Sequence, residues 1–206
     1  MDLIDLTDLD VEPLAAGDFR QWAAEFLGST STDGMDVPCG ECDACCHAAL
    51  FIHIEADEIE TLERIPAALR FPAPGLPDGT VVLGFDENGR CPMLTAQGCG
   101  IYAHRPRTCR HFDCRVLSAT ALGPGEPARH GVSQQAARWQ FSAGLEALQV
   151  VRNIARWLLE QPEGPTAATD LAALALRMHQ ALAGTDPGEH NLQEAFESLM
   201  SGRAGL

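Results

Sequence analysis

Lysine is missing from this 206-residue chain, in which all 14 basic residues are arginine. The absence excludes a Schiff-base lysine and the lysine of a phosphate-binding P-loop. Basic residues are scarce altogether, because 29 acidic residues oppose them and give a formal net charge of −15. Nucleic acids and anionic membranes bind basic surfaces, so we expect neither as the main partner.

Long apolar runs are also missing. A run such as Leu171–Leu176 is far shorter than the roughly 20 residues that a membrane-spanning helix needs. The first residues, MDLIDLTDLDVEP, contain neither the basic region nor the apolar region of a secretory signal. We therefore expect a cytoplasmic protein, in a reducing compartment where clustered cysteines bind metal more often than they form disulfides.

Cysteine is absent from the 92 residues after Cys114. All eight cysteines instead fall within one stretch of 76 residues: Cys39, Cys42, Cys45, Cys46, Cys91, Cys99, Cys109 and Cys114. This distribution predicts that all eight bind metal at a local site. Eight soft thiolates suit iron–sulfur clusters or zinc.

The spacing of the first cysteines is typical of a cluster-binding loop. Gaps of two residues recur in bacterial ferredoxins, where the fourth ligand precedes a proline, as Cys91 precedes Pro92 here. Each of two predicted centres then receives four cysteines: Cys39, Cys42, Cys45 and Cys91 in the first, and Cys46, Cys99, Cys109 and Cys114 in the second. Zinc ribbons use one such gap in each half-site, so zinc is the alternative metal.

The CxxxCxxC pattern of radical S-adenosylmethionine chemistry is absent. Cys42 and Cys46 have its three-residue gap, but position 49 is alanine. The chain also lacks a G-x-S-x-G serine and a glycine-rich phosphate loop, so no catalytic residue is assigned.

Arginine gathers around the last cysteines, at positions 105, 107, 110 and 115. Guanidinium groups can offset the negative charge of metal-bound thiolates or contact an acidic substrate. We predict that Arg105, Arg110 and the only tyrosine, Tyr102, lie around the metal centre. Tyr102 is expected either there or in the core, with proton or radical chemistry as its alternative role. His47 and His111 lie inside the cysteine motifs and are alternative ligands. Because eight thiols already supply enough ligands, a position beside the metal or at the surface is favoured for both histidines.

The composition divides the chain into four parts: an acidic mobile tail over 1–17, a helix and loop over 18–35, a cysteine-cluster metal core over 36–117 and a helical region over 118–206. Together they predict one compact α+β domain, mainly helical. In it, a small irregular core, ligated by cysteines and containing a short β-hairpin, packs on the C-terminal helices.

Periodicity predicts the individual elements. Helices are expected from the cap Asp18 to Leu27, from the cap Asp57 to about Arg64, and over 133–161, 166–183 and 191–200, the last with Asn191 as its cap. Strands are expected over 49–55 and 80–85, and a tight turn at Asn88-Gly89. The proline-rich stretch 66–77 and residues 92–118 have no clean period, so we expect irregular backbone there.

Three segments carry a family resemblance: CGECDACC at 39–46, GRCPML at 89–94 and GCGIYAHRPRTCRHFDC at 98–114. They resemble the CxxCxxCC cysteine-cluster family, the YkgJ-like group of zinc- or iron-chelating domains, over about residues 36–117. The flagellin lysine N-methylase of enteric bacteria carries a similar domain, for which an iron–sulfur cluster is implied. The helical region after residue 118 brings no recognised motif, so the resemblance does not extend the methylase activity to this chain.

Three functions follow as hypotheses. The first is an iron–sulfur protein, with one or two clusters of the 4Fe–4S type, that acts in or assists redox or methyl-transfer modification of a peptide or protein. The second is a non-catalytic zinc module that organises a binding surface. The third is a metal-delivery protein.

Overall fold

The computed structural model describes residues 3–4, 12–29, 35, 37–123, 125, 129–185 and 187–202. Helices make up 48% of the structure and strands 14%, which confirms the predicted mixed α+β, mainly helical fold class. The chain divides into two compact units: unit 1 comprises residues 1–28, 115–125 and 136–206, and unit 2 comprises 29–114 and 126–135.

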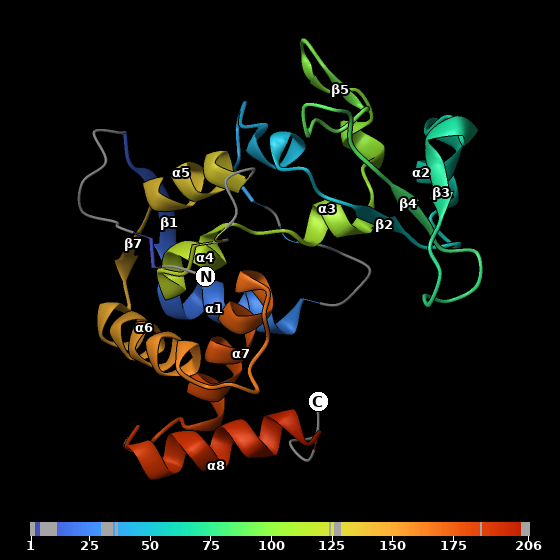
Figure 1. Cartoon of the computed structure of the whole chain (residues 1–206). Coiled ribbons are helices and arrows are strands. Elements are labelled where there is room, and N and C mark those ends of the chain that lie inside the picture. The colour runs from blue at the N-terminus through green and yellow to red at the C-terminus, as the bar shows by residue number, and fades with distance from the viewer. Residues whose placement is uncertain are drawn as a thin grey trace. The chain divides into compact units, whose positions relative to one another are not determined.

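Unit 1 contains most of the helical residues. Its elements are β1 (Leu14–Asp18), α1 (Phe19–Gly28), α4 (Arg115–Thr120), β7 (Trp139–Ala143), α6 (Leu145–Leu159), α7 (Ala168–Ala181) and α8 (Glu189–Met200), while α5 (His130–Arg138) spans the boundary between the units. β1 and β7 form a parallel pair in which Leu14 lies opposite Trp139 (Figure 1).

The core of unit 1 packs aromatic side chains from α1 against β7. The Phe19 ring meets the Phe141 ring edge-on at 5.4 Å, and the Trp22 ring lies 5.1 Å from the same phenylalanine. Every residue of the short helix α4 is buried, and α4 contacts both α6 and α7. This helix begins at Arg115, directly after the last cysteine in the sequence.

Three predicted helices of unit 1 are confirmed, namely α1, α7 and α8. α1 begins after Asp18, whose Oδ1 accepts a hydrogen bond from the Gln21 backbone N–H at 3.0 Å, as an N-cap does. α7 falls within the predicted range 166–183. The predicted cap Asn191 is wrong, because α8 begins at Glu189 and Gly188 is its N-cap.

The long helix predicted over 133–161 is wrong. β7 interrupts it, and Gly144, with φ of 72°, turns the chain into α6. The buried Trp139 and Phe141 alternate with exposed Gln140 and Ser142, which is a strand pattern that pairing with β1 stabilises. The helical periodicity of the flanking segments hid this short alternation.

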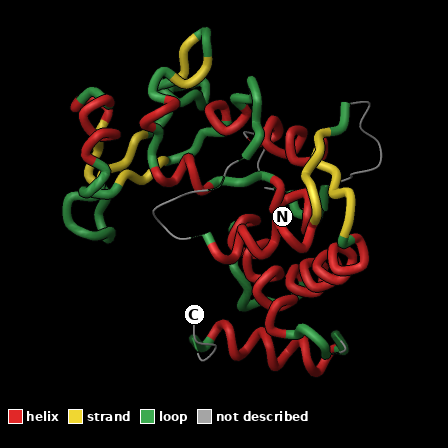
Figure 2. Tube along the Cα trace, turned by 180° about the vertical axis from the view of Figure 1, so that it is seen from behind, coloured by secondary structure: helices red, strands yellow, loops and turns green. Residues whose placement is uncertain are grey.

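Unit 2 consists of short elements. They are η1 (Ala44–His47), β2 (Ile52–Ile54), α2 (Ile59–Arg64), η2 (Ala67–Leu69), β3 (Arg70–Pro72), β4 (Val81–Leu83), β5 (Leu94–Thr95), β6 (Gly98–Cys99), η3 (Tyr102–His104) and α3 (Arg107–His111). β2, β4 and β3 form an antiparallel sheet in that order, and β5 and β6 form a separate hairpin; these strands are yellow in Figure 2.

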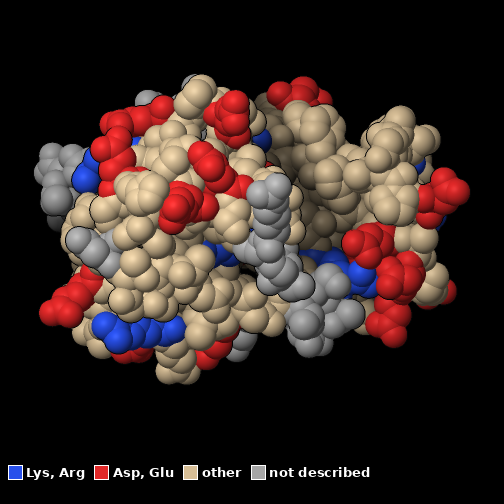
Figure 3. All heavy atoms as spheres, turned by 90° about the horizontal axis from the view of Figure 1, so that it is seen from below, with Lys and Arg blue, Asp and Glu red and all other residues tan. Residues whose placement is uncertain are grey.

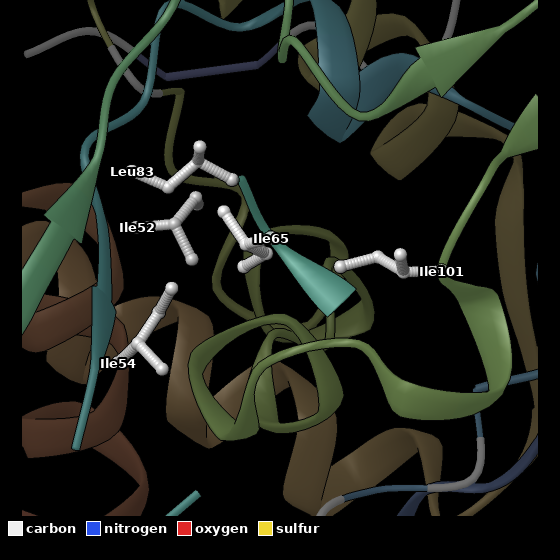
Figure 4. Close-up of a cluster of buried hydrophobic side chains, with 5 residues drawn as sticks. All are labelled: Ile52, Ile54, Ile65, Leu83 and Ile101. Atoms are coloured by element: carbon white, nitrogen blue, oxygen red, sulfur yellow. The ribbon is translucent and has the colours of Figure 1, made fainter. Parts of the chain in front are cut away.

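One hydrophobic cluster holds unit 2 together. Its buried members are Ile52, Ile54, Ile65, Leu83 and Ile101, drawn in Figure 4. The sheet contributes three of them through the inward-facing positions of β2 and β4. Because the cluster is small, it provides limited apolar burial for a unit of this length.

Several expectations for unit 2 need correction. Strands form at β2 and β4 as predicted but are shorter, and β3 lies in the proline-rich stretch that was expected to be irregular. The N-cap of α2 is Glu58, not Asp57. Residues 92–118, also expected to be irregular, contain the β5–β6 hairpin, the short helix η3, the helix α3 and the start of α4. The Asn88-Gly89 turn is confirmed, with the Gly89 N–H donating to the Asp86 carbonyl at 3.0 Å.

Most of the predicted acidic tail, including residues 5–11, lies outside the described residues, and β1 occupies its last four positions, 14–17. In the part of the chain that the structure describes, no helix is long and apolar enough to cross a membrane. On the face seen in Figure 3, acidic side chains outnumber basic ones, in line with the net charge of −15.

Candidate metal centre

All eight cysteines lie in unit 2. The first four sit on a compact loop, in which the Cys42 N–H donates to the Cys39 carbonyl at 3.1 Å and the Cys46 N–H to the Asp43 carbonyl at 2.8 Å. Gly40 has φ of 58°, a left-handed conformation that glycine adopts without steric cost and that closes the turn between the first two cysteines. The loop ends in the single turn of η1, which contains Cys45 and Cys46.

Two backbone hydrogen bonds attach this loop to the segment that follows the Asn-Gly turn. The Ala49 N–H donates to the Gly89 carbonyl at 2.9 Å, and the Cys91 N–H donates to the Cys46 carbonyl at 2.7 Å. These bonds place Cys46 beside Cys91, although 44 residues separate the two in sequence.

A hairpin and the hydrophobic cluster add the next cysteines. The Leu94 N–H donates to the Cys91 carbonyl at 3.0 Å, and Leu94 pairs with Cys99 across β5 and β6. Cys91, Cys99 and Cys109 are all partly buried against the cluster that contains Ile52 and Leu83. Three thiols from distant segments therefore share one apolar surface.

Helix α3 positions Cys109, and the chain beyond it positions Cys114. The Thr108 hydroxyl donates to the His53 carbonyl of β2 at 2.7 Å, which fixes α3 against the sheet. After α3, the chain reaches Cys114, which is only 5% exposed. The Met35 N–H donates to the Arg110 carbonyl at 2.9 Å, so the chain entering the cysteine loop runs beside the segment that leads to Cys114.

The thiols of Cys46 and Cys91 are joined by a hydrogen bond. Donation from Cys46 lowers the pKa of Cys91 to about 6, and the backbone N–H groups of Met93 and Leu94 act in the same direction, while burial opposes them. The same bond, together with burial and the negative charges of Cys91, Cys99 and Cys109, raises the pKa of Cys46.

Burial and neighbouring thiols also raise the pKa values of Cys109 and Cys45. Burial raises the pKa of Cys109 to about 12, the thiolates of Cys91 and Cys99 add to the effect, and Arg105 opposes it. Cys45 is solvent-exposed as a whole residue, but enough of the chain surrounds its sulfur for burial to raise its pKa as well. The next largest contributions to the Cys45 pKa are the charges of Cys114, Cys42 and Cys39.

The donor set fits a soft metal ion. The structure describes all eight cysteines, and none of them forms a disulfide. Among the described residues, no group of three or more cysteine, histidine or acidic side chains is already arranged as a metal site, so binding would draw the thiols closer together. A cation would also relieve the mutual repulsion that several thiolates at close range experience.

The predicted neighbours of the metal lie near these thiols to different degrees. The Arg105 guanidinium stacks over the Tyr102 ring at 4.2 Å and donates to the Tyr102 carbonyl at 3.0 Å. Arg105 also favours the ionised form of Cys109. Tyr102 is 56% exposed, so it is not a core residue. The Nε of Arg110 is buried and has no hydrogen-bond partner in the described structure.

The other two arginines of the predicted group have structural contacts. Arg107 forms ion pairs with Glu55 at 2.5 Å and with Asp57 at 3.0 Å. Arg115 belongs to unit 1, where its guanidinium lies 5.9 Å from the centre of the Trp139 ring.

The sequence provided no signal for the role of Glu58. Its side chain is buried, and its two carboxylate oxygens accept hydrogen bonds from the Glu55 N–H at 3.0 Å and the Arg107 N–H at 2.6 Å. Glu58 thereby joins the start of α2 to the start of α3, the helix that carries Cys109. Glu58 and Arg107 are 49 positions apart in the sequence, which explains why local pattern did not reveal the contact.

The two histidines considered as alternative ligands are both described. The His47 Nε2 lies 3.3 Å from the Asp43 carboxylate, on an exposed part of the loop. His111 is the last residue of α3. The His104 Nδ1 lies 3.2 Å from Glu60.

Replacement of Gly89 by alanine is expected to destabilise unit 2. Gly89 has φ of 76°, and a Cβ there would lie 3.2 Å from the Cβ of Ala49, closer than such carbons usually approach. Left-handed backbone alone costs alanine about 1–2 kcal/mol. We therefore expect Gly89→Ala to lower the free energy of unfolding by about 2 kcal/mol or more in urea denaturation. The close contact between the new Cβ and the Ala49 Cβ adds to the strain of the left-handed backbone.

Gly75→Ala is the matched control for this variant. Gly75 has φ of 85°, but a Cβ there would meet no atom within 4 Å. The control therefore carries the backbone strain without the contact to Ala49. Equal stability of the two variants would contradict a role for the close approach between Gly89 and the cysteine loop.

In the comparison with known proteins, one family model matches part of the chain. Residues 38–130, which are 93 of the 206 residues, match CxxCxxCC, described as a "putative zinc- or iron-chelating domain". The matched range includes all eight cysteines, from Cys39 to Cys114. No curated protein and no solved structure matches the chain.

Proposed function

We propose that this chain, whose residues 38–130 match the CxxCxxCC family, is an iron–sulfur protein that acts in or assists the modification of a peptide or protein. The match and the eight cysteines support metal binding itself. The observation that carries the proposal is the gathering of eight cysteines, none in a disulfide, within one compact unit.

Iron–sulfur clusters are favoured over zinc by the thiol loop. Cys39, Cys42 and Cys45 follow one another at two-residue gaps, the spacing by which ferredoxins hold three corners of a cluster. Enough cysteines are present for two clusters of the 4Fe–4S type. When bound, such clusters supply one-electron transfer or a site for group-transfer chemistry.

Partial exposure of the thiol loop supports a role in modification. A centre that exchanges electrons or groups with a peptide must lie near the surface, and the residue Cys45 is exposed although the chain surrounds its sulfur. Tyr102 and the stacked Arg105 provide an exposed aromatic and cationic surface next to Cys109 in the same unit. The redox or methyl-transfer type of the reaction belongs to this proposal and is motivated by the two potential sets of four thiolates, the nearby arginines and the family match.

Metal analysis of anaerobically purified protein tests the identity of the centre. We expect coloured protein with broad visible absorption, and iron and acid-labile sulfide in about equal amounts, because inorganic sulfide bridges the iron atoms of such clusters. Reconstitution with iron and sulfide under the same conditions should raise both together. Colourless protein without sulfide would contradict the iron–sulfur proposal.

Zinc is the second candidate, because each set of four thiolates also matches a structural zinc site. In that case the chain is a binding module without catalysis. Anaerobic protein that retains about two zinc ions and no sulfide would support this alternative.

A further inference from the structure

We propose that the eight cysteines form two four-thiolate centres with a defined membership. The inner centre consists of Cys46, Cys91, Cys99 and Cys109, and the outer centre of Cys39, Cys42, Cys45 and Cys114. The partition rests on the proposed function, since it assumes that the thiols bind metal. It differs from the partition suggested by spacing alone, because Cys91 and Cys114 exchange places.

The inner centre is assembled by backbone contacts and by a shared apolar surface. The hydrogen bond from the Cys91 N–H to the Cys46 carbonyl, at 2.7 Å, and the bond between their thiols make these two cysteines direct neighbours. Cys99 reaches the same place through the β5–β6 hairpin, in which it pairs with Leu94. Cys109 joins them because it packs on the same hydrophobic cluster as Cys91 and Cys99.

The outer centre consists of Cys39, Cys42 and Cys45 from the loop, together with Cys114, the buried last cysteine. The turn that closes from Cys42 onto Cys39 keeps these two together. The hydrogen bond between the Met35 N–H and the Arg110 carbonyl aligns the chain four residues before Cys39 with the chain four residues before Cys114. The loop therefore starts beside the segment that ends at Cys114.

The thiol charges that act on Cys45 and on Cys46 agree with the proposed membership of the two centres. The thiol charges that act most strongly on Cys46 are those of Cys91, Cys99 and Cys109. For Cys45 they are those of Cys114, Cys42 and Cys39, with Cys109 weaker than these three. Adjacent residues in the chain thus face different sets of thiols. This explains how Cys45 and Cys46 can serve two centres.

The surroundings of the two centres differ. Three of the inner cysteines, Cys91, Cys99 and Cys109, pack on the cluster of isoleucine and leucine side chains. The outer centre instead combines the exposed residue Cys45 with the buried Cys114. The two centres are therefore expected to lose metal to a chelator at different rates.

Partial demetallation followed by thiol alkylation tests the membership in the wild-type chain. Anaerobic protein is treated with limiting chelator, alkylated with iodoacetamide and fragmented as an intact chain in the mass spectrometer. We expect a species with four labels, either on Cys39, Cys42, Cys45 and Cys114 or on the four inner cysteines. Either species would support the partition. A species in which Cys91 is labelled together with Cys39, Cys42 and Cys45 would overturn it, as would a direct passage from no labels to eight.

Double variants provide a second readout that does not depend on alkylation. Each of Cys39→Ser, Cys91→Ser and Cys114→Ser should remove half of the metal. Cys39→Ser with Cys114→Ser should also remove only half, because both belong to one centre, whereas Cys39→Ser with Cys91→Ser should remove nearly all. The opposite pattern would restore the partition based on spacing.

Failure of the partition and failure of the proposed function are distinguishable. Wild-type protein that binds neither iron nor zinc would overturn both. Metal-loaded protein with another labelling pattern would overturn the partition alone. Zinc in place of iron–sulfur would change the identity of the metal but leave the membership of each centre open to the same test.

Discussion

Removal of the metal is expected to unfold the cysteine region while α6 and α7 stay folded. The regular elements between residues 38 and 114 are two to six residues long, and one small cluster supplies their buried apolar surface. Metal ligation therefore contributes a large part of the folding free energy, which reaches about 10 kcal/mol or more for structural zinc. Hydrogen exchange of the β2 and β4 amides should accelerate by more than about 100-fold on chelation, since each 1.4 kcal/mol is a factor of ten.

The helices of unit 1 are an internal control in this experiment. α6 and α7 are long, contact each other and bury many apolar residues, among them Val151, Ile154 and Leu176. Their amides should exchange equally slowly before and after chelation. Unchanged exchange in β2 and β4 would show that the hydrophobic cluster of unit 2 suffices without metal.

Replacement of Glu58 by alanine is expected to be among the most destabilising single substitutions in unit 2. The carboxylate of Glu58 is buried and accepts the backbone N–H groups of Glu55 and Arg107. Alanine would leave both donors without a partner, and each buried unsatisfied group costs about 1–3 kcal/mol. Thermal unfolding should therefore show a loss of about 2–5 kcal/mol, accompanied by a lower metal content because α3 carries Cys109.

Two further variants separate this effect from the loss of a charge. Glu58→Gln keeps one acceptor oxygen, so we expect an intermediate loss of stability. Glu63→Ala removes an exposed carboxylate from the same helix and should change stability by less than about 0.5 kcal/mol. If Glu58→Ala were as stable as Glu63→Ala, the carboxylate would not be the link between α2 and α3.

Elements whose signals are local could be predicted from the sequence. The cap of α1 depends on Asp18 and the residues just after it, and the Asn88-Gly89 turn depends on four neighbouring positions. β7 could not be predicted, because its stability depends on pairing with β1 at the other end of the chain. The short strand β3 likewise depends on β4, and the prolines around it obscured its pattern.

The same distinction holds for the candidate site. Spacing was sufficient to predict that the eight cysteines belong together, but it did not reveal which of them are neighbours. The backbone bond between Cys46 and Cys91 joins segments 44 residues apart and has no signature in either segment. Glu58 was missed for the same reason. The predicted metal binding is supported by the family match, while the ligand roles stay predictions.

The parallel pairing of β1 with β7 has a consequence for the order of assembly during synthesis. Leu14 and Trp139 are 125 positions apart, and all of unit 2 lies between the two strands in sequence. A pairing of such high contact order forms late, because closing the intervening chain costs entropy before the strand contacts contribute any stabilising free energy. All eight cysteines leave the ribosome before β7 does. Metal can therefore order the cysteine region first, and the helical unit then completes its fold on a nascent chain that is already loaded.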